Sequence, residues 1–516
     1  MSSGRVHARN LSLNTFSFAL NLLVVFLLSP YIVRTLGTAS YGVWSLLNAV
    51  AGYMGVLDLG IRSSVGRHIN FYRGKNDDRG VDETIRSGLT YFVLAGAGII
   101  LLGVILGRGF PQVFDSIPEA HRDTIHWLLP LLAANLLITA CGSIFSSVLA
   151  SHDRFDLTRA VDLVVLIART AGVILMLSYG LGLVGLAVAT VGGNAIAAVG
   201  NYILAKRVHK GLRIWPLHFS RQRARELFGF GLAAFVSAIS VRIIGQTDLL
   251  VMEWAENVEA VAIYSIGAMG IYYSNTLLGQ VTRTFGPQVQ RSVAAGDMET
   301  ARWYFWRQSR LALILGIPMY VGALFFAEPF IRVWMGDEIG QTSVNRAAMV
   351  MTILAGSKML VMLNISVAPL LTAMGHVWDT TRVTVLEAIT NLGLSLLLAI
   401  VFGWGMAGVA CGTLFARLLT AYPLFRLLAS SRAGLKLSRL LARTEGLLLL
   451  AGGAFAAVCL AVRQIGPVDS WADLGLQVLA ALAGFVPITW FGLLDPPDRR
   501  KLLSVLHIGR KRETQS

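Results

Sequence analysis

The chain has 516 residues, of which 55% are hydrophobic and only 14% are charged, and its mean hydropathy is +0.64. About a quarter of the residues in a typical soluble domain are charged, so this composition excludes an ordinary soluble globular protein. The formal net charge is +15, but the Lys and Arg residues lie in short segments between long apolar runs. This distribution is typical of membrane topology, and we expect no nucleic acid among the partners.

The apolar runs predict about fourteen transmembrane helices, because each helix needs roughly 20 mainly apolar residues to cross the hydrocarbon core. The predicted spans are 11–33, 41–62, 87–107, 124–149, 159–179, 183–204, 227–251, 258–282, 309–330, 345–373, 383–402, 406–428, 445–462 and 473–495. The first run is interpreted as a retained helix rather than a cleaved signal. The predicted fold class is therefore an all-α polytopic membrane protein.

The basic residues between the spans predict the orientation. With the N-terminus in the cytoplasm, 34 of the 44 Lys and Arg residues fall on the cytoplasmic side and six fall in outer loops. Cytoplasmic loops of membrane proteins carry an excess of Lys and Arg. We therefore expect a multi-pass protein of the bacterial inner membrane with both termini in the cytoplasm.

An internal repeat relates the two halves of the chain. A shift of 223 residues aligns Tyr179–Thr190 with Phe402–Thr413. The matched pairs are Gly180/Gly403, Gly182/Gly405, Gly185/Gly408, Ala187/Ala410 and Thr190/Thr413. The same shift, without a gap, pairs Tyr41 with Tyr264. One constant offset over two long blocks is a much stronger signal than a local similarity between glycine-rich helices.

The repeat predicts two six-helix lobes. Since six is even, both lobes begin in the cytoplasm, and such repeats are related by an axis along the membrane normal. The predicted parts are lobes at 10–205 and 227–428, a basic linker at 206–226, two added helices at 445–495 and a basic cytoplasmic tail at 496–516. Lobes of this kind rock around a central site, which gives alternating access.

Several motifs point to a family. Arg34–Trp44 reads R-T-L-G-T-A-S-Y-G-V-W, Leu57–Ile61 reads L-D-L-G-I, and a charged arm runs from Gly66 to Arg86. A second arm, Gly286 to Arg310, follows the eighth span. Together these features resemble the polysaccharide transporter family, the oligosaccharide flippases of the multidrug/oligosaccharidyl-lipid/polysaccharide superfamily. The resemblance implies an undecaprenyl-diphosphate-linked oligosaccharide as cargo, from O-antigen, capsule or exopolysaccharide, and a cationic cavity between the lobes.

Four cations lie near the middle of predicted spans: Arg169, Arg242, Lys358 and Arg417. Each costs about 2.5–3.5 kcal/mol at membrane depth on insertion scales, so it must face a cavity or a partner. A diphosphate cannot cross hydrocarbon unpaired, and Arg offers it a bidentate fork. We expect these cations to bind the substrate. A structural pair is the alternative for Arg169, with Asp162 two turns away. Snorkelling or packing beside the third-helix region is the alternative for Arg417.

Neutral polar residues supply candidates for contact with the sugar, because amides and aromatic rings suit hydroxyl-rich ligands. The candidates are Asn14, Asn21, Asn48, Tyr272 and Asn275. Hydrogen bonding between helices is the alternative for each. Glu387 and Asp248 are the candidates for coupling transport to H⁺ or Na⁺, with structural ion pairs as the alternative.

No catalytic constellation is expected. The sequence lacks a Walker A motif and any paired-carboxylate, metal-ligand or nucleophile pattern. Cys141, Cys411 and Cys459 lie in apolar runs, so neither a disulfide nor a metal site is predicted. The predicted protein is not an enzyme and has no cofactor. Its expected partners are the lipid-linked oligosaccharide, membrane lipids, and polysaccharide polymerase and chain-length proteins.

Three other functions are the alternatives to this one. A multidrug exporter of the same superfamily typically has twelve spans, and a cationic drug would favour acids at the centre of the cavity. A peptidoglycan lipid-precursor flippase can also have fourteen spans, but the Arg34–Trp44 motif favours the oligosaccharide flippases. A membrane glycan polymerase is the enzyme alternative, although the longest outer loops, 108–123 and 331–344, are short for one.

Overall fold

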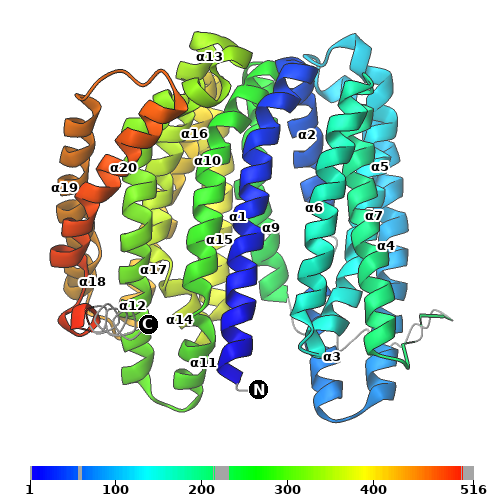
Figure 1. Ribbon diagram of the computed structural model, residues 1–516, viewed down its shortest axis with the longest axis horizontal. Coiled ribbons are helices and arrows are strands. Elements are labelled where there is room, and N and C mark those ends of the chain that lie inside the picture. The colour runs from blue at the N-terminus through cyan, green and yellow to red at the C-terminus, as the bar shows by residue number, and fades with distance from the viewer. Residues whose placement is uncertain (1–2, 56–60, 213, 216–231, 501–502, 504–516) are drawn as a thin grey trace, which may run out of the picture. The chain divides into compact units, whose positions relative to one another are not determined.

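The computed structural model describes residues 3–55, 61–212, 214–215, 232–500 and 503. Helices make up almost all of this part of the chain, and it contains no β-strand (Figure 1). The predicted all-α fold is confirmed. Asp58, part of the predicted linker and most of the predicted tail lie outside the described residues.

Eleven helical segments of the described residues are long and apolar enough to cross a membrane. The second predicted span falls on α2, Thr38–Met54, which has only 17 residues. The eighth falls on α10, Val258–Arg283, which is long enough but too polar to be counted among the eleven. The ninth and tenth lie together in the segment Met298–Ala373. The chain is thus a multi-pass membrane protein, and the count of fourteen spans remains a prediction.

Contacts divide the chain into two compact units, Met1–Ser265 and Ile266–Ser516. The lobe boundaries read from the repeat remain a prediction. The helices of the first unit are α1 (Ser3–Leu36), α2 (Thr38–Met54), α3 (Ile61–Gly74), α4 (Asp78–Val113), α5 (Glu119–Ser151), α6 (Phe155–Ser178), α7 (Gly182–Val208) and α9 (Leu232–Ala255), followed by the start of α10 (Val258–Arg283).

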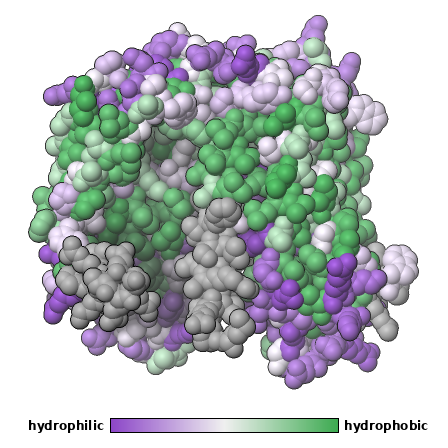
Figure 2. Space-filling model, viewed as in Figure 1, coloured by the Kyte–Doolittle hydropathy of each residue, from purple (hydrophilic) through white to green (hydrophobic). Residues whose placement is uncertain are grey.

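The apolar surface of the first unit follows its helices. Hydrophobic side chains cover the middle of α6 and α7, and hydrophilic ones gather at the end where α3 lies (Figure 2). A band of this kind suits a hydrocarbon core bounded by two polar interfaces. The helices therefore present the surface that a membrane requires.

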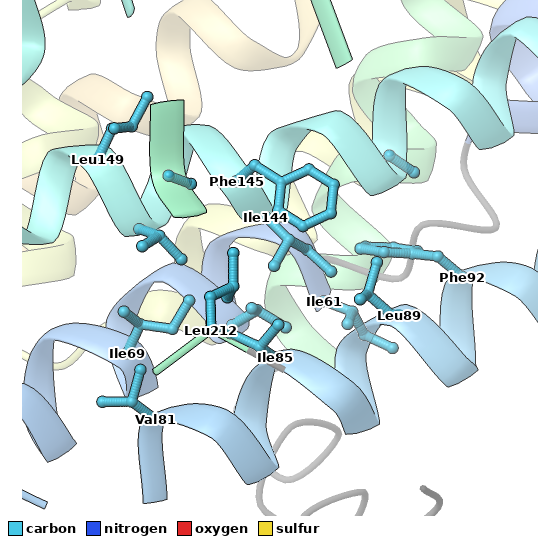
Figure 3. Packing of buried hydrophobic residues seen from close by; sticks show 14 residues of the cluster. Ile61, Ile69, Val81, Ile85, Leu89, Phe92, Ile144, Phe145, Leu149 and Leu212 are labelled. Carbon is cyan, nitrogen blue, oxygen red and sulfur yellow. The ribbon is translucent and has the colours of Figure 1, made fainter. Parts of the chain in front are cut away.

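The short helix α3 is the amphipathic start of the first charged arm. Ile61, Val65 and Ile69 recur every fourth residue and are fully buried, because residues four apart share one face of a helix. They pack against α4 and α5, where Ile85 and Ile144 belong to the same core (Figure 3). This packing holds the charged arm against the ends of two long helices.

The repeat is visible in the backbone. Gly180 and Gly403 have φ of 76° and 69°, and Gly182 and Gly405 have φ of 53° and 52°. Residues other than Gly rarely adopt such left-handed angles. Each glycine pair therefore makes the same turn in both copies, before α7 and before α16 (Gly405–Leu419).

The second unit contains the rest of α10 and the remaining helices. They are α11 (Gly286–Ala294), α12 (Met298–Gly316), η2 (Ile317–Val321), α13 (Gly322–Asn364), α14 (Val367–Ala373), α15 (Val377–Leu396), η3 (Leu397–Val401), α16 (Gly405–Leu419), α17 (Ala421–Ser431), α18 (Leu437–Arg443), α19 (Glu445–Arg463), α20 (Trp471–Ile488) and η4 (Thr489–Leu493). Gly340, with φ of 74°, interrupts α13 between the ninth and tenth predicted spans. The η segments are π-helical, and η2 contains Pro318; proline removes a helical hydrogen-bond donor.

Candidate functional site

Arg169 lies on α6 of the first unit and is half-buried. Its aliphatic stem packs over Gly193 of α7, where an added Cβ would lie 3.1 Å from the Cβ of Arg169. Asp162, the alternative partner on the same helix, instead pairs with Arg159 at 2.9 Å. Among the described residues, Arg169 forms no salt bridge. A guanidinium at this depth without an acid partner remains available to an anion.

Arg242 lies on α9 of the first unit, and its side chain is exposed. It too has no salt bridge within the described part of the chain. One turn further on, Gln246 packs against Gly52 of α2, where an added Cβ would meet the Gln246 Cδ at 3.2 Å. The glycine thus allows α2 and α9 to approach closely beside the arginine.

Asp248, a candidate for ion coupling, is buried at the same level of α9. Its Oδ2 accepts a hydrogen bond of 2.8 Å from the hydroxyl of Tyr264 on α10. The neighbouring Thr247 shares a hydroxyl–hydroxyl hydrogen bond with Tyr53 of α2. These contacts make a polar cluster that joins α2, α9 and the start of α10 within the first unit.

Arg417 and Glu387 are brought together in the second unit, although the sequence predicted different roles for them. The Arg417 Nε donates to Glu387 Oε1 at 2.8 Å, and Nη1 donates to the Ser357 hydroxyl at 2.7 Å. Both charged side chains are about nine-tenths buried. Through Ser357 the pair joins α13, α15 and α16, and it adds no net charge. It is therefore also compatible with the alternative of a structural ion pair that holds helices together. Their roles in transport remain predictions.

The repeat relates this site to one in the first unit. The shift of 223 residues pairs Arg417 with Asn194 and Lys358 with Asn135. The Asn194 Nδ2 donates to the Asn135 Oδ1 at 2.8 Å. The first unit therefore carries two hydrogen-bonded neutral amides at these positions, whereas the second unit carries two cations. Lys358 is half-buried and follows Ser357 in α13.

The candidates for sugar contact are spread over three helices. Asn48 on α2 is exposed, and its Nδ2 donates to the Trp44 carbonyl at 2.8 Å. Tyr272 on α10 is 65% exposed, whereas Asn21 and Asn275 are half-buried. Asn14 lies in α1, but its side chain is outside the described residues. Asn48 and Tyr272 thus offer the most accessible side chains among the four candidates whose side chains are described.

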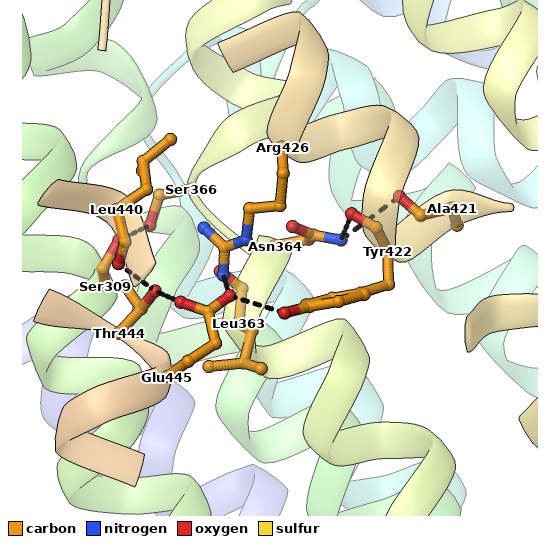
Figure 4. A network of polar contacts seen from close by, with 10 residues as sticks. All are labelled: Ser309, Leu363, Asn364, Ser366, Ala421, Tyr422, Arg426, Leu440, Thr444 and Glu445. Carbon is orange, nitrogen blue, oxygen red and sulfur yellow. Dashed lines mark hydrogen bonds and ion pairs between the residues drawn. The ribbon is translucent and has the colours of Figure 1, made fainter. Parts of the chain in front are cut away.

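Two polar clusters were not singled out from the sequence. In the first unit, the Ser116 hydroxyl donates to buried Glu253 at 2.9 Å and accepts from the Val258 N–H at 2.9 Å. In the second, Arg426 is 3% exposed. It pairs with Glu445 at 2.9 Å and donates to the Leu363 carbonyl (Figure 4). The partners lie far apart in the chain, so no local spacing signals either contact.

The described residues contain no group of three His, Cys, Asp or Glu that is arranged to hold a metal ion. The polar groups of the site are instead arginine, amide, hydroxyl and carboxylate side chains at membrane depth. Such a set can bind an anionic and hydroxyl-rich ligand through hydrogen bonds.

Two curated relatives are similar over much of the chain. The "Uncharacterized membrane protein EpsK" of Bacillus subtilis is 24% identical over 500 residues, which cover 96% of each chain. A "Putative O-antigen transporter" of Shigella flexneri is 23% identical over 336 residues, covering 64% of this chain and 77% of the relative.

Two solved structures share the fold. The lipid II flippase MurJ in its inward closed conformation has a TM-score of 0.69 and 13% identity, and the match covers 93% of this chain and 98% of MurJ. A multidrug resistance MATE family transporter in an inward-facing conformation has a TM-score of 0.65 and 16% identity, covering 81% and 94%. Both are similar to this chain in fold.

The family resemblance read from the motifs is confirmed by a direct match. Residues 31–343, more than half of the chain, match the family described as "Polysaccharide biosynthesis protein". The matched region includes the Arg34–Trp44 motif and both charged arms. The chain belongs to this family of polysaccharide biosynthesis proteins.

Proposed function

We propose that the protein flips an undecaprenyl-diphosphate-linked oligosaccharide across the bacterial inner membrane by alternating access. The glycan is a repeat unit of an O-antigen, a capsule or an exopolysaccharide. Both termini lie in the cytoplasm in this proposal, as the 34 cytoplasmic Lys and Arg residues favour. The name of the Shigella relative, a putative O-antigen transporter, supports this class of substrate.

The observation that carries the proposal is the pair of arginines at membrane depth in the first unit. Arg169 and Arg242 form no salt bridge with the described residues, and Arg242 is exposed. A positive charge placed there without a partner is costly in hydrocarbon. A diphosphate supplies the missing negative charge and accepts bidentate hydrogen bonds from a guanidinium. A cationic drug would instead be repelled by both.

The remaining candidates have supporting roles. Lys358 is a further candidate for binding the diphosphate, and Asn48 and Tyr272 are candidates for offering an amide and an aromatic ring to the sugars. Asp248 is the proposed site for H⁺ or Na⁺ coupling, and Glu387, which already pairs with Arg417, is the second candidate. No bond is made or broken in this function, so the protein is proposed to act as a transporter and not as an enzyme.

Complementation of a strain that lacks the gene tests the proposal. The double variant Arg169→Ala/Arg242→Ala should lose export of the polymer while its membrane level stays normal, because only the anion-binding groups are removed. Arg159→Ala is the matched control on α6, since Arg159 already pairs with Asp162, and it should support export. Full export by the double variant would contradict the proposal.

The phenotype of the deletion strain separates transport from polymerisation. A missing flippase leaves lipid-linked precursor on the cytoplasmic side of the membrane. A missing polymerase instead allows single repeat units to reach the cell surface. Exported but truncated glycan in the deletion strain would therefore favour the enzyme alternative.

A further inference from the structure

The short helix α18 carries an unpaired cationic stripe at the start of a membrane-spanning helix. Lys436 precedes the helix, and Arg439 and Arg443 lie four residues apart on one face; all three side chains are exposed. None of the three forms a salt bridge with the described residues. Since α19 begins at Glu445, the chain itself places this stripe at the boundary of the membrane.

Four acidic side chains of the second unit already pair with arginines outside the stripe. Glu445 pairs with Arg426 at 2.9 Å, and Asp379 pairs with Arg432 at 3.1 Å. Asp498 pairs with Arg307 at 3.0 Å, and Asp495 pairs with Arg310. None of these four acids forms a salt bridge with the stripe.

Three leucines of α18 lie on the side next to the stripe. Leu440 is fully buried in the core formed with α11, α12, α14 and α17, whereas Leu437 and Leu441 are 37% and 41% exposed. Around the helix axis, the buried Leu440 has the two arginines on one side and the two exposed leucines on the other. This arrangement is typical of a helix that lies in the membrane interface, with leucines toward the acyl chains and arginines toward the headgroups.

Two tryptophan rings of α12 lie against arginine side chains in this region. The Arg443 guanidinium lies 5.3 Å from the ring centre of Trp306, and the Arg307 guanidinium lies 5.0 Å from that of Trp303, a residue that is 51% exposed. Tryptophan concentrates at membrane–water interfaces. A guanidinium over a ring face keeps its N–H groups free for an anion.

The loop before α18 is held in place. The Arg302 Nη2 donates to the Ala433 carbonyl at 2.9 Å, and the Leu435 N–H donates to the Ala429 carbonyl at 3.2 Å. Leu435 is 5% exposed. The stripe is therefore fixed before any ligand binds, so little ordering entropy opposes binding.

We propose that Lys436, Arg439 and Arg443 bind the headgroup of an anionic phospholipid, such as phosphatidylglycerol, beside the two C-terminal helices. The leaflet is the cytoplasmic one in the orientation proposed above, but the binding itself does not depend on transport. Phosphate oxygens accept hydrogen bonds from the guanidinium groups, while the acyl chains contact Leu437 and Leu441.

Binding of single phospholipids to the purified full-length protein in a neutral detergent, followed by native mass spectrometry, tests the proposal. Each interfacial cation strengthens attraction to an anionic lipid about fivefold. The triple variant Lys436→Gln/Arg439→Gln/Arg443→Gln should therefore bind phosphatidylglycerol about 100-fold more weakly, with phosphatidylcholine binding unchanged. Arg439→Lys/Arg443→Lys, which keeps the charge, should bind within a few fold of the original protein.

A variant with the same loss of charge in the first unit is the control. Lys206, Arg207 and Lys210 are also exposed, and their replacement by Gln should leave phosphatidylglycerol binding within about threefold of the original protein. Equal weakening by both triple variants would show only non-specific attraction and would overturn the proposed site. Unchanged binding by the α18 triple variant would also overturn it.

If the α18 triple variant does not fold, Arg439→Gln alone should weaken binding about fivefold. Unweakened binding by this single variant would overturn the proposal.

Discussion

At the scale of single residues, the proposed function depends on which charges at membrane depth are paired. Arg417 and Glu387 neutralise each other at 2.8 Å with little exposure to solvent. Arg169 and Arg242 have no such partner among the described residues. Because an unpaired charge is costly away from water, the first pair is suited to holding helices together and the two arginines are suited to a charged ligand.

Glu387→Gln tests the role of the buried pair. The substitution leaves Arg417 buried without its anion, so we expect a loss of about 3–5 kcal/mol in stability and a clear fall in the unfolding temperature of the purified protein. The double variant Arg417→Met/Glu387→Leu should recover most of this loss, since no charge is then left unpaired. Unchanged stability of Glu387→Gln together with lost transport would instead support ion coupling at Glu387.

The sequence identified these charged residues but not their partners. Asp162 and Arg169 share a helix face, yet Asp162 pairs with the nearer Arg159 at 2.9 Å. Arg417 and Glu387 come from different helices, and helical spacing contains no information about contacts between helices. For the same reason the buried pair of Arg426 and Glu445 was not predicted.

At the scale of helices, close packing in the first unit depends on small residues in α2. An added Cβ at Gly42 would lie 1.9 Å from the carbonyl oxygen of Val258, which is a backbone atom. Small residues at helix interfaces in membranes allow backbones to approach in this way. The beginning of α10 is therefore held against α2 by a contact that only glycine permits.

Gly42→Ala should destabilise this contact. The clash with a backbone oxygen can be relieved only by moving a helix, and overpacking of this kind costs about 1–3 kcal/mol. The unfolding temperature of the purified variant should fall accordingly. Gly192→Ala on α7 is the matched control, because an added Cβ there meets nothing within 4 Å. Equal unfolding temperatures for the two variants would contradict the packing described here.

Most helices and the repeated turns were predictable from the sequence. Long apolar runs identify spanning helices, because no other structure open to this chain can satisfy the backbone N–H and C=O groups in lipid. The paired glycines at 180/403 and 182/405 predicted equivalent local structure, and their φ angles agree within 7° and 1°. The turn at Gly340 and the short α2 were less evident, because apolar content does not fix where a helix ends.

At the scale of the whole molecule, the distribution of Lys and Arg predicts the topology. Single cysteines introduced at Arg79 and Arg207 in a variant without the three native cysteines should react with an impermeant maleimide only after the inner membrane is opened. A cysteine at Asp469, an exposed position between α19 and α20, should react in intact spheroplasts. The opposite pattern of labelling would overturn the proposed orientation.

Flipping by the purified protein in proteoliposomes tests most directly whether Arg169 and Arg242 bind the diphosphate during transport. A fluorescent undecaprenyl-diphosphate oligosaccharide placed in one leaflet should become accessible in the other when the original protein is present. The Arg169→Ala/Arg242→Ala variant should flip at least tenfold more slowly, because it lacks the proposed diphosphate ligands. Equal rates for the original protein, the variant and protein-free liposomes would contradict the account.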